Sequence, residues 1–412
     1  MLKNLRSNIL IYGGTNAIKS LVPFLMLPIL TAYISPKEYG DLSLIETTIL
    51  FLLSFVMLNI NGAINVEYFR KDNKSEYKSY VLNALLLSFF SFLVLSTILF
   101  ILQEQIANFI NIDVKWVRLL TLFTFLRVLS SVVLVIFQAS QQVKKYAYFS
   151  ISQTIIDFAL SYYFVVILGY GIDGRLLGVY IAFFIFSLIA LYILKKMNYF
   201  KANVTLKYTK DILAFGLPLI PHSIGGIVLA MSDRYFISYF EGNSAVGLYS
   251  VAYQVSALLL LISMSVNQAW SPMFFKLMKN QEYYKINKII ILLLILFSMA
   301  TIIVYFVSPI IYSYFIDKKF YASKVYLIFL LAGFTFQSFY FLFTNYLFYY
   351  KKTSLLATIT ITGAIVNIIL NYLFIKSYGS IGVAYATAIT WFIYFVAVFV
   401  ISTKIKGVYS EK

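Results

Sequence analysis

Long apolar runs, separated by short charged segments, recur along the whole chain. Each holds about 20 residues or more, and at ~1.5 Å of rise per residue a helix of that length crosses the ~30 Å hydrocarbon core of a bilayer. The ten-residue alternation of a membrane β-barrel is a different pattern. The runs predict twelve transmembrane helices, at residues 9–33, 41–62, 79–102, 117–138, 146–168, 175–194, 211–239, 245–270, 287–311, 322–349, 354–375 and 381–403.

Lysine and arginine are unevenly distributed over the segments between these runs. The N-terminus, the even-numbered loops and the C-terminal tail carry 22 of them, and the other loops carry 8. Because basic loop residues stay on the cytoplasmic side, both termini are predicted to be cytoplasmic. The first run lacks an A-x-A-like cleavage site and is predicted to be a retained helix.

Composition agrees with a multi-pass membrane protein. Hydrophobic residues make up 61% of the chain and charged residues 12%, with a mean hydropathy of +0.85, whereas soluble proteins are about 25% charged. The formal net charge of +17 lies mainly in loops of one face, so anionic membrane lipids rather than nucleic acid are the predicted partner.

Several kinds of chemistry are excluded by residue content. The chain has no cysteine and one histidine, so it has no disulfide, no thiolate nucleophile and no typical zinc-ligand set. It also has no G-x-x-x-x-G-K-[ST] phosphate loop. We therefore expect no catalytic residue, no metal and no cofactor, as in a secondary transporter rather than an enzyme.

Short matches recur along the chain at a nearly constant offset. Residues 39–43 are similar to 246–250 at an offset of 207, and 61–70 are similar to 267–276 at 206. Six spans, an even number, separate the copies, so the two halves have the same orientation in the membrane. The repeat predicts an all-α fold of two six-helix bundles, residues 1–203 and 204–412, facing each other across a central cleft.

Polar residues inside the first span mark one helical face. Asn16 and Lys19 lie on this face with Tyr12 and Thr15. A charge near the bilayer centre costs roughly 2.5–3.5 kcal/mol, so a buried charge is a functional candidate by default. Lys19 is interpreted either as a cation that lines a cavity or as the partner of a carboxylate.

Other spans also contain ionisable residues. Arg127 lies in the fourth span, Asp157 in the fifth and Glu46 in the second. Two interpretations of Asp157 stay open: an ion pair with Arg127, or a site for a coupling ion or proton, a role for which Glu46 is the second candidate.

The seventh span is the most irregular. Pro218 and Pro221 remove backbone donors and Gly225-Gly226 loosens the helix, so we expect it to bend. His222 lies at mid-depth, either facing a ligand or satisfied in the interior. Adjacent residues on a helix point about 100° apart, so Asp233 and Arg234 are predicted to brace neighbouring helices; Arg234 is also a candidate ligand.

Four stretches carry a family resemblance: PFLMLPILTAYISPKEYGDLSL (23–44), GLPLIP with SDRYFISYF and AVGLYSVAYQ (216–254), QAWSPMFFK (268–276) and VNIILNYLFIKSYGSIGVAYATAI (366–389). Together they resemble Wzx-type O-antigen flippases of the multidrug/oligosaccharidyl-lipid/polysaccharide (MOP) exporter superfamily. The resemblance covers essentially the whole chain.

The resemblance implies a V-shaped pair of bundles in the bacterial inner membrane. Such a protein would move undecaprenyl-diphosphate-linked oligosaccharide to the periplasmic leaflet for lipopolysaccharide O-antigen, driven by an ion gradient or the membrane potential. A glycan polymerase and a chain-length regulator are the expected protein partners. The candidate substrate ligands are Lys19, Asn16, Arg127, His222 and Arg234, and the candidate coupling residues are Glu46 and Asp157. A drug or metabolite exporter of the same superfamily is the alternative, followed by a membrane glycan polymerase.

Overall fold

The computed structural model describes residues 2–70 and 73–410, and all regular secondary structure in these ranges is helical. Twelve of the described helices are long and apolar enough to cross a membrane, which confirms the predicted number. Helices suit this environment because each satisfies its own backbone hydrogen bonds where no water is present.

The chain divides into two compact units, Met1–Ile34 with Asp41–Ile224 and Ser35–Gly40 with Gly225–Lys412. The sequence repeat predicts a division earlier, after residue 203. The first unit contains α1 (Leu2–Tyr33), most of α2 (Pro36–Met57), α3 (Ile60–Arg70), α4 (Lys74–Ile101), α5 (Gln103–Ile110), α6 (Val114–Ala139), α7 (Val143–Tyr162), the π-helical turn η1 (Tyr163–Ile167), α8 (Gly171–Lys196), η2 (Tyr199–Lys201), α9 (Leu206–Gly216), η3 (Leu217–Leu219) and the start of α10 (Ile220–Met231).

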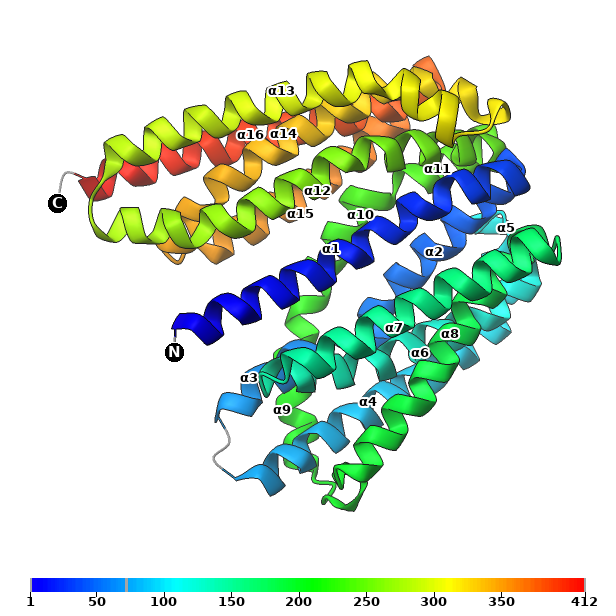
Figure 1. Cartoon of the computed structure of the whole chain (residues 1–412), viewed down its shortest axis with the longest axis vertical. Coiled ribbons are helices and arrows are strands. Elements are labelled where there is room, and N and C mark those ends of the chain that lie inside the picture. Colours follow the sequence, from blue (N-terminus) through cyan, green and yellow to red (C-terminus); the bar gives the residue numbers. More distant parts are fainter. Residues whose placement is uncertain (1, 71–72, 411–412) are drawn as a thin grey trace. The chain divides into compact units, whose positions relative to one another are not determined.

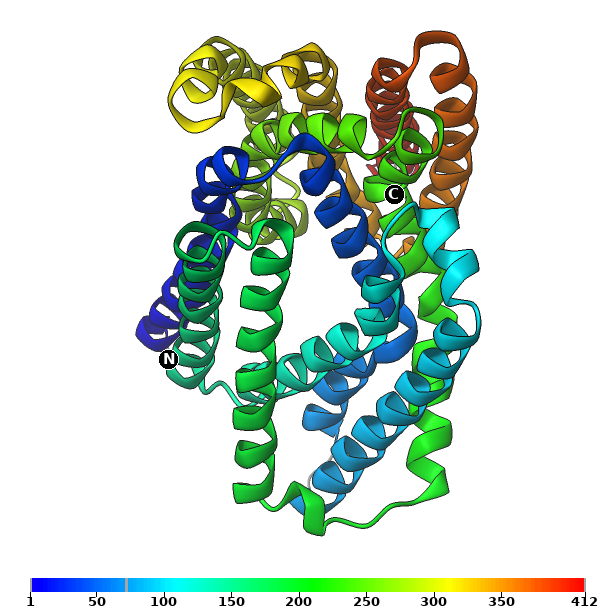
Figure 2. The ribbon, with the colours of Figure 1, turned by 90° about the vertical axis from the view of Figure 1, so that its right-hand side faces the viewer.

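Helix α6 is central to the packing of the first unit. It contacts α3, α4, α7 and α8, while α1 packs against α7 (Figure 1). Val132 and Ile136 of α6 are buried in a core that also contains small residues, Ala84 of α4 and Ala190 of α8. Lipid tails are as apolar as leucine, so helix association in a membrane depends on such close packing. Figure 2 shows the connection from α8 through η2 to α9 at one end of this unit.

The second unit contains the remaining elements: α11 (Asp233–Glu241), α12 (Asn243–Lys279), α13 (Tyr283–Phe315), η4 (Lys318–Ser323), α14 (Lys324–Tyr349), α15 (Thr353–Tyr378) and α16 (Ser380–Ser410). Helix α14 packs against α12, α13 and α16, and α15 packs against α16 (Figure 1). Phe274, Phe297 and Leu342 are buried at the centre of one core of this unit.

Two glycines allow close backbone contact within the second unit. A Cβ atom on Gly40 would overlap the carbonyl of Asn243, and one on Gly247 would overlap the carbonyl of Pro36. The sequence repeat aligns these same two glycines at an offset of 207. Small residues at both positions therefore let the start of α2 lie directly against the start of α12.

Repeated turns support the predicted duplication. In the turn after α6, the amide of Gln142 donates to Phe137 O at 2.8 Å, and in the turn after α14 the amide of Lys352 donates to Leu347 O at 2.8 Å. Gln141 and Lys351 occupy the left-handed region in these turns, with φ of 55° and 56°. The corresponding helices α6 and α14 thus end in the same way.

The structure corrects the ends of several predicted spans, among them the second and the seventh. The second, predicted as 41–62, begins at Pro36 and ends at Met57, because Leu58 and Asn59 adopt left-handed conformations (φ 49° and 54°) that stop an α-helix. The seventh, predicted as one helix over 211–239, ends at Met231. As expected, it is irregular: a 3-10 turn, Leu217–Leu219, interrupts it at Pro218.

Candidate functional site

A cavity of about 310 Å³ lies in the first unit and is lined by residues of α1, α6, α7 and α8. It combines predicted site residues from three different spans. Its lining consists of Lys19, Val22, Pro23, Arg127, Ser130, Ser131, Leu134, Gln153, Thr154, Asp157, Arg175 and Phe183.

Arg127 is held in the cavity wall by two kinds of contact. Its Nη2 donates to both carboxylate oxygens of Glu46 on α2, at 3.0 and 2.7 Å. Its guanidinium carbon lies 5.1 Å from the centre of the Phe183 ring on α8. The pair is partly accessible, with side-chain exposures of 16% for Arg127 and 32% for Glu46. An ion pair at this depth avoids the cost of two isolated charges.

Of the two interpretations of Asp157, the ion pair with Arg127 is not the one that forms, because Arg127 pairs with Glu46. Asp157 on α7 instead accepts a hydrogen bond from Arg175 Nη1 at 2.7 Å, and the same nitrogen donates to Ser161 Oγ at 2.5 Å. Helices α7 and α8 can approach closely because Gly178 of α8 faces the backbone of Ser161, where a Cβ atom would overlap. Arg175, one turn before Gly178, is thereby brought beside Asp157.

Arg175 is a site residue that the sequence reasoning missed. The sixth span was predicted to begin at residue 175, so this arginine was counted as a loop residue. Helix α8 begins at Gly171, four residues earlier, and Arg175 lies in the cavity wall. Tyr170-Gly171 before the apolar run was the available signal, because glycine commonly stands at helix boundaries.

Lys19 differs from the two arginines. It lies on α1 with an exposed side chain at the cavity, and no ion pair or hydrogen bond joins it to any residue of the described chain. Lys19 was interpreted either as a cation that lines a cavity or as the partner of a carboxylate, and its position agrees with the first of these. The cavity and its ion pairs thus include three cations and two carboxylates, which leaves an excess of positive charge.

Several donors in the cavity wall make no hydrogen bond to any residue that the structure describes. They are Arg127 Nε, Gln153 Nε2 and Ser130 Oγ, all buried. An arginine Nε and an amide nitrogen only donate hydrogen bonds, and buried donors normally have an acceptor. A ligand with several acceptor oxygens would satisfy them.

Other predicted ligands lie elsewhere or outside the described atoms. His222 of α10 is exposed and is not part of the cavity lining. Asn16 lies on α1, but its side chain is outside the part of the structure that is described. The cavity therefore unites Lys19, Arg127 and Asp157, with Glu46 behind Arg127.

The second unit contains a different polar centre around Asp233. This residue is fully buried at the start of α11, and its carboxylate accepts hydrogen bonds from Tyr249 on α12, from Thr387 Oγ1 on α16 at 2.8 Å and from Asn371 Nδ2 on α15 at 2.9 Å. One carboxylate thereby links four helices, an arrangement suited to the predicted bracing role.

Arg234, the next residue, makes its own contacts within the second unit. Its guanidinium carbon lies 4.5 Å from the centre of the Tyr253 ring, and Nη1 donates to Ala230 O at 3.3 Å. Only 5% of the residue is exposed. Arg234 is therefore buried within the second unit, with its guanidinium stacked on Tyr253.

Known proteins share this fold. A solved multidrug resistance MATE family transporter of the MOP superfamily, in an inward-facing conformation, matches with a TM-score of 0.79 at 14% identity, over 95% of this chain and 96% of its own. The lipid II flippase MurJ, in an inward closed conformation, matches with a TM-score of 0.78 at 18% identity, over 95% of this chain and 86% of its own.

One sequence relative is named as a glycan biosynthesis flippase. The "Probable low-salt glycan biosynthesis flippase Agl15" of Haloferax volcanii is 27% identical over 204 residues, which cover 48% of this chain and 41% of that protein. Residues 218–373 also match the MatE family.

Fold and comparisons together define a multi-pass membrane protein with the MOP transporter fold. Within that class, the chain belongs to the family described as "Polysaccharide biosynthesis protein", which matches residues 5–278. The resemblance to Wzx-type flippases of the MOP superfamily is thus confirmed, and the all-α fold with twelve spans is confirmed with it.

Proposed function

We propose that this protein is a flippase for undecaprenyl-diphosphate-linked oligosaccharide, of the O-antigen type, in the bacterial inner membrane. It would move the carrier from the cytoplasmic to the periplasmic leaflet by alternating access, with both termini in the cytoplasm. The observation that carries the proposal is the cationic cavity of the first unit, with Lys19 free of ion pairs to the described residues.

A diphosphate fits the unsatisfied groups of this cavity. Its oxygens only accept hydrogen bonds, and the unpartnered atoms Arg127 Nε and Gln153 Nε2 only donate them. Charge-assisted hydrogen bonds to phosphate are roughly twice as strong as neutral ones. Sugar hydroxyls could bond the remaining serine and threonine oxygens, while the polyprenyl tail stays in the bilayer.

Glu46 and Asp157 are the residues through which we propose that a coupling ion drives transport. Each holds one arginine of the cavity, and the guanidinium fork binds carboxylate and phosphate with the same geometry. A proton or cation that neutralises either carboxylate would free its arginine for the diphosphate. Binding of the substrate and of the coupling ion would then favour each other.

A second function has specific support. The match to the MatE family and the MATE transporter structure favour a drug or metabolite exporter. The positive excess of the cavity would repel an organic cation, so an anionic metabolite would be the more suitable cargo of such an exporter. The glycan flippase explains the unpartnered donors and the polysaccharide family together.

Complementation tests the proposal directly. We expect the protein to restore surface-glycan export in a bacterial strain that lacks its own flippase, with a matching polymerase and chain-length regulator supplied. Failure with every defined glycan, together with increased drug resistance, would favour the exporter instead.

The double variant Arg127→Gln with Glu46→Gln links this function to the cavity. It removes both charges of the ion pair and leaves neither side chain as an unpaired charge. We expect at least a tenfold loss of export with a normal protein level, measured by surface-glycan staining and immunoblot. Full export would show that the pair is structural.

A further inference from the structure

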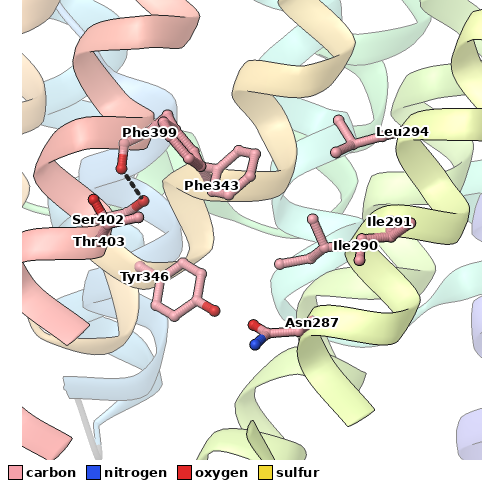
Figure 3. Close-up of a pocket in the computed structure, with 9 residues that line it drawn as sticks. All are labelled: Asn287, Ile290, Ile291, Leu294, Phe343, Tyr346, Phe399, Ser402 and Thr403. Atoms are coloured by element: carbon pink, nitrogen blue, oxygen red, sulfur yellow. Dashed lines mark hydrogen bonds between the residues drawn. The ribbon is translucent and has the colours of Figure 1, made fainter. Parts of the chain in front are cut away.

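A second cavity, of about 280 Å³, forms a groove in the second unit between α13 and α16. Figure 3 shows Ile290 and Leu294 of α13 across the groove from Phe399 of α16, with Phe343 of α14 between them; Ile291 of α13 also lines the groove. Helix α14 packs against both neighbours and closes the bottom of the groove.

The groove changes from apolar to polar along its length. One end is lined by Leu294, Phe343 and Phe399, and the other by Asn287, Tyr346, Ser402 and Thr403 (Figure 3). Asn287 and Leu294 are seven positions apart on α13, which corresponds to ~10 Å along the helix. The groove therefore matches a molecule with a polar end and an apolar chain.

The polar end offers both acceptors and a donor. The hydroxyls of Ser402 and Thr403 donate to the carbonyls of Phe399 and Val400, at 2.8 and 2.9 Å, so their oxygens still have lone pairs free to accept. The Tyr346 hydroxyl has no hydrogen-bond partner among the described residues, and its oxygen points toward Asn287 in Figure 3.

Four lysines lie close in sequence to the residues of this polar end or in the turn that follows α14. Lys288 follows Asn287 directly, Lys404 follows Thr403, and Lys351-Lys352 form the turn after α14; all four are exposed. Glu282, at the start of α13, is bound by Lys285. The polar end thus has the charge that suits an anion.

The surroundings of the groove are those of a lipid-facing surface. Ile291, Ile295, Met299 and Ile302 of α13 are each more than half exposed, which in a membrane-spanning helix places them against lipid. A partner protein would normally cover about 800 Å² on each side, far more than this short groove offers. Basic pockets between transmembrane helices on the cytoplasmic side commonly bind anionic lipid head groups.

We propose that the groove binds one acyl chain of an anionic phospholipid of the lysine-rich leaflet, with the lipid phosphate near Lys288 and Lys404. The chain lies between α13 and α16 against Phe343. The bound lipid fills the gap that α13 and α16 leave above α14 and fastens α13, the most apolar span, to its unit.

Native mass spectrometry of the purified full chain tests this proposal. Phosphatidylglycerol and phosphatidylcholine with the same acyl chains are added at equal concentration, and we expect preferential retention of phosphatidylglycerol. The double variant Lys288→Gln with Lys404→Gln should lower that retention roughly tenfold, because each basic residue near an anionic head group adds several-fold to binding. The matched control, Lys318→Gln with Lys319→Gln, changes the same charge in η4 and should retain the lipid.

A variant that fills the groove distinguishes binding of the acyl chain in the groove from simple attraction between the lipid phosphate and the lysines. Ile291→Trp puts an indole into the groove, leaves the lysines in place, and should also lower retention of phosphatidylglycerol. Equal loss in both lysine double variants, no loss in Ile291→Trp, or displacement of the phospholipid by equimolar undecaprenyl phosphate would each overturn the proposal. Export activity is not the measurement, so the result is independent of the proposed flippase function.

Discussion

The two units each contain a polar centre, and the two centres are built in opposite ways. In the first unit, Arg127 and Asp157 are 16% and 19% exposed at the side chain, line an open cavity, and lie near donors that have no partner. In the second unit, Asp233 is fully buried and accepts hydrogen bonds from three neighbouring helices.

This difference separates two uses of charge inside a membrane protein. A buried carboxylate with three donors contributes to helix assembly, since in hydrocarbon no water replaces a lost partner. Partly exposed cations beside unpartnered donors suit a ligand that binds and dissociates. The comparison therefore favours a structural role for the Asp233 centre, and it supports the proposal that the Lys19 cavity binds a ligand.

The largest expected effect is on folding, at Asp233. Asp233→Ala leaves the hydroxyls of Tyr249 and Thr387 and the amide of Asn371 without their acceptor, which should lower the free energy of unfolding by about 3 kcal/mol. A thermal melt of the purified protein measures this loss. Asp233→Asn retains acceptor capacity and should be destabilised less; an unchanged melting temperature in the alanine variant would remove the structural assignment.

An intermediate effect is expected at Lys19, on transport alone. Lys19→Gln removes the cation that has no ion pair with the described residues. Export should fall about tenfold, the effect of losing one charge-assisted hydrogen bond to the substrate. The melting temperature should stay constant. Glycan export and a thermal melt are measured on the same variant.

Lys115→Gln is the matched control for Lys19. Lys115 lies in the same unit and makes an exposed ion pair with Asp173 at 3.0 Å, outside the cavity. Exposed pairs contribute little, so this variant should export normally and melt normally. If Lys19→Gln destabilises the protein as much as Asp233→Ala, the contrast between the two centres does not hold.

The smallest effect is expected at Gln153. Gln153→Leu removes one neutral donor of the cavity and should lower export about threefold, the size of a single neutral hydrogen bond. Because Gln153 Nε2 makes no hydrogen bond to a described residue, the variant should also be at least as stable as the parent protein. Unchanged export with raised stability would mean that this donor does not contact the substrate.

Much of the architecture follows from local sequence properties. Twelve apolar runs predict twelve spans because a run of that length has one stable arrangement in a bilayer, a helix across it. Pro218 likewise predicts an irregular seventh span, since its missing donor is a property of the residue itself. The candidates Lys19, Arg127 and Asp157 were found because a charge at that depth is costly wherever its partner lies.

Tertiary structure alone decided which of these charges meet. Arg127 pairs with Glu46, 81 residues away, and Asp157 pairs with Arg175 because Gly178 lets α7 and α8 approach closely. Helical periodicity gives the face on which a residue lies but not the neighbour that the face meets, which depends on the packing of the whole bundle. The sequence by itself determined a multi-pass helical protein with unusual charges inside its spans. The fold determined that some of these charges line the open Lys19 cavity, whereas Asp233 is buried and links four helices.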